Sequence, residues 1–150
     1  MASTYNKFQI FASDLVGKVH DLLGTAGAGA DTLKVYLSNV APSASLDAVK
    51  ADLAEITNQF GYTAPVSVAN AGVAAAGTVT VTGTNVTITA AGGSVGPFQY
   101  VALYNDTPAS PVDPLIAWWD YGTPLTLADG ESFQINFNAS AVSGTIFTLV

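Results

Sequence analysis

The fold class of this chain is decided by residues 96–138, which read GPFQYVALYNDTPASPVDPLIAWWDYGTPLTLADGESFQINFN. Three apolar runs, at 98–104, 115–121 and 133–137, alternate there with segments rich in Pro, Gly, Asp and Asn. Runs of aromatic and β-branched residues between turn residues are typical of β-strands. Both tryptophans lie in this stretch, and large aromatic side chains bury the most apolar area per residue. We therefore expect these strands to form the centre of the core.

Further strands are predicted outside this stretch, at 32–38 and 145–150. Residues 78–90, TVTVTGTNVTITA, alternate twice about 83–85. This pattern predicts a β-hairpin whose inward-facing residues are Val79, Val81, Val86 and Ile88. In total about eight to nine strands are expected, as in a two-sheet sandwich. The predicted fold is mainly β: an antiparallel, jelly-roll-like sandwich in one domain over residues 1–150, with one or two short helices near the front.

Those short helices are predicted in two places. Residues 5–23 carry apolar side chains at helical spacing: Phe8, Phe11, Leu15, Val19 and Leu22. Because Gly17 and several β-favouring residues interrupt this segment, two strands around 8–11 and 16–22 are the alternative. Residues 46–56 predict a helix with Ser45 as N-cap, because one face would be apolar: Leu46, Val49, Leu53 and Ile56.

Charge is scarce and unevenly distributed. Only 10% of the residues are charged, against about 25% in an average globular domain. There is no Arg, every charged residue from position 51 onward is acidic, and the net charge is −7; the lysines are Lys7, Lys18, Lys34 and Lys50. Such a chain repels phosphate, so we expect no nucleic-acid partner. A soluble monomer usually carries more surface charge, so the deficit indicates a surface that a partner covers.

The sequence also predicts neither a membrane span nor a secreted chain. The mean hydropathy of +0.39 is high, but Ser, Asn, Thr and Gly interrupt the most apolar region, 66–91. It therefore never reaches the roughly 18 apolar residues of a transmembrane helix. The first residues lack the basic-then-apolar pattern of a signal peptide. We expect an intracellular origin.

Residues with catalytic or metal-binding chemistry are few. His20 is the single histidine and no cysteine is present, so a thiolate zinc site is excluded and a catalytic triad lacks its usual context. The glycine-rich residues 24–30 lack the Lys-Ser/Thr ending of a phosphate-binding loop. The late carboxylates, in contrast, leave calcium binding as an open alternative to solvated loops; they are Asp106, Asp113, Asp120, Asp129 and Glu131. We expect no enzyme, no cofactor and no metal.

The tryptophan pair gives the candidate interface. Trp118 and Trp119 are adjacent, so in a strand their side chains point to opposite faces. One of them is then expected in the core and the other towards a surface or a partner. Aromatic side chains often anchor interfaces, and we take Trp118, Trp119 and Tyr121 as the possible interface residues.

Several segments resemble a known family: KVHDL, DTLKVYLSNVAP, ADLAEI with GYT, GPFQYVALYNDT, DPLIAWWDYG and LTLADGESFQINF. They are similar to small virion proteins of tailed bacteriophages, in particular capsid decoration (cement) proteins. The resemblance runs from about residue 7 to 137 and is weakest across 66–78. GPFQYVALYND and DPLIAWWDYG are its most specific pieces.

This resemblance implies a structural protein without catalytic residues, made in the host cytoplasm and carried on the capsid surface of the virion. Its expected partners are the major capsid protein and further copies of itself, with a trimer as the expected homo-oligomer. The alternative is a tail- or fibre-associated β-sandwich module that binds a receptor or carbohydrate, on which Trp119 or Tyr121 would stack. A hydrolase that uses the late carboxylates is a third hypothesis.

Overall fold

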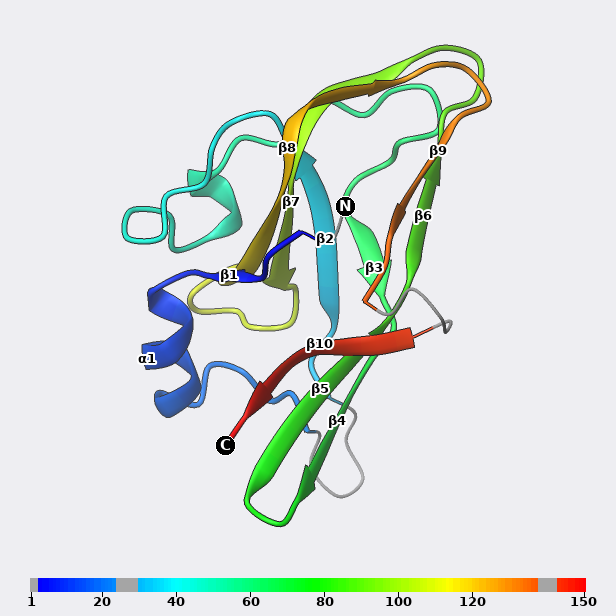
Figure 1. Ribbon diagram of the computed structural model, residues 1–150. Coiled ribbons are helices and arrows are strands. Elements are labelled where there is room, and N and C mark those ends of the chain that lie inside the picture. The colour runs from blue at the N-terminus through cyan, green and yellow to red at the C-terminus, as the bar shows by residue number, and fades with distance from the viewer. Residues whose placement is uncertain (1–2, 24–29, 138–142) are drawn as a thin grey trace.

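The computed structural model describes residues 3–23, 30–137 and 143–150 (Figure 1). Within these ranges the helical elements are α1 (Ile10–Val16) and a 3-10 turn, η1 (Lys50–Asp52). The strands are β1 (Asn6–Lys7), β2 (Leu33–Ser38), β3 (Val66–Val68), β4 (Asn70–Ala75), β5 (Thr78–Thr84), β6 (Val86–Thr89), β7 (Val95–Asn105), β8 (Leu115–Leu127), β9 (Ser132–Ile135) and β10 (Ser143–Leu149).

The strands form three sheets, and neighbouring strands are antiparallel throughout. The largest sheet has the order β1-β8-β7-β2-β3, the second has the order β10-β5-β4, and the third consists of β6 and β9. The two long central strands, β7 and β8, come from the stretch quoted at the outset. The mainly β, antiparallel prediction is confirmed, and the arrangement is consistent with a β-sandwich.

The core lies on both faces of the five-stranded sheet. On one face, Leu33, Val35 and Leu37 of β2 pack in a cluster that also includes Val81 of β5 and Ile88 of β6. On the other face lies a smaller cluster: Phe8, Tyr36, Leu53, Ala102, Tyr104 and Leu115. Alternate residues of one strand face opposite sides of a sheet, so β2 contributes to both clusters. The run at 96–104 therefore reads as nearly continuously apolar because it is covered on both sides.

The hairpin predicted about 83–85 is wrong. Both strands exist, but β5 pairs with β4 and β10, whereas β6 pairs with β9. Gly83 is not a turn residue: an added Cβ would lie 2.8 Å from Val68 Cγ1 and 2.9 Å from Ile146 Cδ1. The glycine therefore allows close packing in mid-sheet. The actual hairpin joins β4 to β5 through Ala76 and Gly77, both with positive φ.

The helix predicted at 46–56 is also wrong, apart from the short turn η1. Ala48 and Lys50 bond to the backbone that enters β8: the Leu115 N–H donates to the Ala48 carbonyl and the Lys50 N–H to the Asp113 carbonyl. These tertiary bonds hold the segment extended and override its helical propensity, because tertiary context routinely outweighs propensity. Ser45 is not an N-cap. Instead, Oδ2 of Asp52 accepts the N–H groups of Ala48 and Val49, which lowers the pKa of this carboxyl.

For residues 5–23 the predicted helix is confirmed only at Ile10–Val16, and the alternative of two strands around 8–11 and 16–22 is wrong. The segment begins as the short strand β1, which pairs with Ala117 and Trp118 of β8, and continues as α1. The helix ends at Gly17, the residue that weakened the helical prediction. Strands at 32–38 and 145–150 are confirmed within one or two residues by β2 and β10. The predicted loop at 24–30 lies outside the described residues, apart from Ala30.

Candidate functional site

Trp118 and Trp119 lie on opposite faces of β8, as predicted. Trp118 packs on Phe8, with ring centroids 4.5 Å apart, and joins the smaller cluster. Trp119 joins the larger cluster and meets Tyr5 and Phe137 edge-on, each at 5.8 Å. The expectation that one is buried and the other lies towards a surface or a partner is wrong, because both side chains are half-buried. A core cluster lies on each face of the sheet, so each tryptophan packs against one of the two clusters.

Trp119 and Tyr121 form one wall of a groove of about 690 Å³. The other residues that line it are Ser3, Val101, Ser132, Phe133, Gln134, Ile135, Asn136 and Phe137. Aromatic rings and uncharged polar side chains make up this lining, and no charged residue of the described ranges contributes. Of the predicted interface residues, the structure therefore brings Trp119 and Tyr121 together and places Trp118 elsewhere.

The groove also runs along β9 and the two residues that follow it. Six consecutive residues, 132–137, line the groove, although successive side chains of a strand point to opposite faces. A molecule that contacts all of them must lie along the edge of β9. Within the described part of the chain, β9 pairs only with β6. Sequence reasoning identified 133–137 as a strand but missed this edge, because alternation shows the faces of a strand and not its neighbours.

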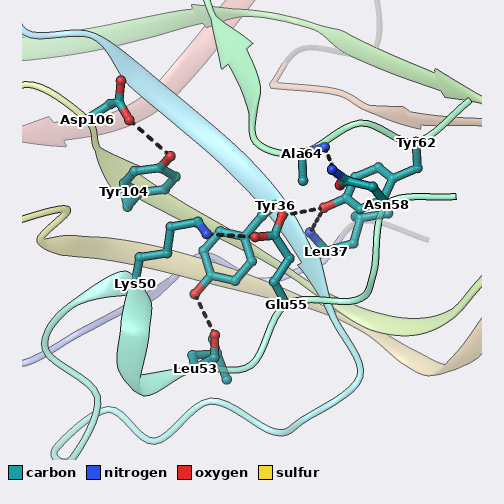
Figure 2. Close-up of polar contacts among 10 residues, drawn as sticks. All are labelled: Tyr36, Leu37, Lys50, Leu53, Glu55, Asn58, Tyr62, Ala64, Tyr104 and Asp106. Atoms are coloured by element: carbon teal, nitrogen blue, oxygen red, sulfur yellow. Dashed lines mark hydrogen bonds and ion pairs between the residues drawn. The ribbon is translucent and has the colours of Figure 1, made fainter.

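A second set of polar contacts ties the segment after η1 to the main sheet, as Figure 2 shows. The buried Tyr62 hydroxyl accepts the Leu37 N–H at 2.8 Å and donates to Glu55 Oε1 at 3.1 Å. Burial, with the Glu55 carboxylate as a further cause, raises the pKa of Tyr62 well above its usual range. The phenol therefore stays neutral and serves as a fixed structural bond.

Lys50 completes this polar set. Its ammonium contacts Glu55 Oε2 at 2.6 Å and lies over the rings of Tyr36 and Tyr104, 5.2 and 5.9 Å from their centroids. Such cation–π contacts add to the ion pair. Burial raises the pKa values of both tyrosines. These contacts hold the segment after η1 against the five-stranded sheet.

His20 is buried and bonded to Asn105 at the end of β7. Its Nδ1 lies 3.0 Å from the Asn105 amide nitrogen, whose second bond goes to Asp31 Oδ2. Because the Asn105 amide donates this bond, Nδ1 of His20 accepts it, and the neutral ring carries its proton on Nε2. Nε2 lies 4.0 Å from Asp14 Oδ2. Burial lowers the pKa of His20, and the Asp14 and Asp31 carboxylates oppose that shift.

We expect His20 to make folding stability depend on pH. Because the folded-state pKa is lowered, the stabilising effect of neutral His20 is complete above about pH 6.5 and is lost as the pH falls below it. The melting temperature should therefore drop more between about pH 7.5 and 5.5 in the wild type than in His20→Gln. Equal drops in melting temperature for the two proteins would show that the pKa of His20 is the same in the folded and the unfolded state.

The late carboxylates do not converge. Asp106 contacts Lys34 Nζ at 2.6 Å, whereas Asp120 accepts from Gln99 and the Gly122 N–H. Asp129 accepts the Gly92 N–H, and Glu131 accepts the Ala128 N–H. Across the ranges described, no three His, Cys, Asp or Glu residues are grouped to hold a metal ion.

The same ranges contain no helix long and apolar enough to cross a bilayer.

Four of the ten exposed large apolar residues of the described ranges lie on one side of the molecule, here called the loop side. It comprises α1, residues 39–53 and the loop at 106–114, which lie together on the left of Figure 1. Backbone bonds join these parts, from Gln9 to Ala44 and from Lys50 to Asp113. Its exposed apolar residues are Val16, Val40, Leu46 and Val112.

Comparison with known proteins gave no match to any family model, curated protein or solved structure.

Proposed function

We propose that this chain is a structural virion protein that binds the outer surface of a bacteriophage head and stabilises it, as a capsid decoration protein does. The proposal rests on the resemblance of GPFQYVALYND and DPLIAWWDYG to that family. It includes a jelly-roll-like sandwich, a homo-oligomer with three copies as the expected order, and the major capsid protein as partner. No catalytic role is part of it.

The observation that carries the proposal is the set of exposed apolar side chains on the loop side. Leu46 is 79% exposed and Val112 is 62% exposed, although burying such side chains stabilises a protein by about 1.5–3 kcal/mol each. Exposed apolar side chains on one side of a molecule are a candidate interaction site. The loop side is therefore the face we assign to the capsid.

The lysines support the same assignment. Lys34 and Lys50 each lie 2.6 Å from a carboxylate oxygen of this chain, so their charge is neutralised internally. Lys7 and Lys18 are exposed and flank α1 on the loop side. Two lysines supply little electrostatic attraction, so binding must depend mainly on apolar contacts and hydrogen bonds, which salt screens little.

Sedimentation with undecorated phage heads tests the proposal. We expect the purified protein to pellet with the heads at both low and moderate salt. Leu46→Asp should weaken this binding at least tenfold, because it puts a charge into an apolar contact and about 1.4 kcal/mol corresponds to a tenfold change in affinity. The matched control is Thr87→Asp, on the exposed face of β6 away from the loop side.

A protein that stays in the supernatant at both salt concentrations would refute the decoration role. The tail- or fibre-associated module would then take its place, with the groove beside Trp119 and Tyr121 as the binding site. Equal binding by Leu46→Asp and the wild type would instead refute the loop side as the capsid-facing surface.

A further inference from the structure

Among the strands of the described residues, β4 also lies at the edge of its sheet. In the described residues β4 pairs only with β5, and the hairpin that they form projects from the lower end of the molecule in Figure 1. An unpaired edge presents a row of backbone N–H and C=O groups that can bond to another strand. Natural proteins usually protect such an edge with charged residues, proline or a bulge.

β4 has none of these protections. Its sequence is NAGVAA, its pairing with β5 continues without a register shift, and Val73 is 62% exposed. Residues 56–105 contain no charged side chain at all. The backbone of Leu22 lies over one face of β4 at Gly72, but the side chains of 73–75 are exposed.

The groove beside β9 is complementary to this edge in three respects. It offers the edge of β9, which pairs only with β6 among the described residues, and its lining carries no charge. Its walls hold large rings, those of Trp119, Tyr121 and Phe133, against which the small side chains of β4 can pack. Addition of an extended segment to a free sheet edge is a common mode of protein recognition.

We propose that β4 of one copy adds as a strand to the β9 edge of a second copy, within this groove. Charge indicates where two copies of this chain can meet: each copy carries a net charge of −7, so the copies repel each other least where neither has a charged side chain. β4 and β9 lie in different parts of the molecule (Figure 1). The contact is therefore head-to-tail, and it closes into a ring when the rotation between copies permits. Three such contacts would close the trimer expected for the decoration protein.

Light scattering on the purified full-length protein tests this contact. We expect the wild type to show a mass above the 15.3 kDa of a single chain. Val73→Lys, on the β4 edge, and Gln134→Lys, on the groove edge, should each reduce the assembly to monomers, because an edge lysine opposes strand addition. The matched control is Val112→Lys, at a loop-side position with the same exposed fraction, 62%, and it should remain assembled.

Mixing the two defective variants distinguishes a head-to-tail contact from a symmetric one. Val73→Lys keeps an intact groove and Gln134→Lys keeps an intact β4, so the mixture should form a pair of chains, although neither variant associates alone. Recovery in the mixture also shows that both variants are folded. No recovery would overturn the head-to-tail contact.

A monomeric wild type, or assembly of either variant at the wild-type mass, would overturn the proposal outright. Hydrogen exchange gives a check that needs no substitution: amide protection of 70–75 and 132–137 should rise with protein concentration. Unchanged protection in these two segments of an assembled protein would contradict the proposal. Both assays contain no capsid, so their results are separate from the head-binding result.

Discussion

Phe98→Ala is expected to destabilise the protein by about 3–5 kcal/mol, the usual range for removing a fully buried aromatic ring. Phe98 is 0% exposed in the larger core cluster, and its ring meets Phe133 edge-on at 5.0 Å. It therefore connects the five-stranded sheet to β9. In a domain of this size each kcal/mol lowers the melting temperature by about 2–4 °C, which a thermal melt resolves easily.

Tyr121→Ala is the matched control for Phe98→Ala. Tyr121 packs on the same Phe133 ring, edge-on at 5.9 Å, but from the exposed side of the groove. It is 44% exposed, so its truncation should cost only about 0.5–1.5 kcal/mol, the value of an aromatic pair. Similar losses in the two variants would show that β9 does not pack on the sheet as described.

Gly61→Ala is expected to cost about 2–5 kcal/mol, from two causes. Gly61 has φ +94°, a conformation that costs an L-residue about 1–2 kcal/mol. An added Cβ would also overlap the Thr89 carbonyl oxygen, and overpacking costs about 1–3 kcal/mol more. The turn at Gly61 approaches β6 closely because the Ala91 N–H donates to the Phe60 carbonyl at 2.8 Å.

Gly77→Ala separates these two causes. Gly77 has φ +81°, and an added Cβ would meet nothing within 4 Å. Gly77→Ala therefore has the conformational cost without the steric overlap. Chemical denaturation should show that it lowers the free energy of unfolding by about 1–2 kcal/mol. Equal losses at Gly61 and Gly77 would contradict the close approach of the turn to β6.

The strands could be predicted from the sequence because each has its own local pattern. The aromatic runs at 98–104 and 115–121 identified β7 and β8, and the Thr-Val alternation identified β5 and β6. The pairing of strands could not be predicted in the same way. Gly83 and Asn85 look like a turn, yet Gly83 is a packing residue, and the true turn uses Ala76 and Gly77.

The candidate site was predicted only in part, because local patterns show the faces of a strand but not its neighbours. A two-residue period places Trp118 and Trp119 on opposite faces, and the structure confirms this. The groove depends on which edge of β9 has no partner, and that is a property of the whole sheet arrangement. The helix expected at 46–56 failed because its backbone bonds to the chain entering β8, a long-range competition that local periodicity does not contain.

The copy number of the protein in purified virions tests the central claim, a structural role on the phage head, most directly. Quantitative mass spectrometry of intact particles would give it relative to the major capsid protein. A decoration protein should be present in a fixed ratio to the capsid protein, in enough copies to cover the shell. A small number of copies that co-purifies with tails and not with heads would contradict the proposal.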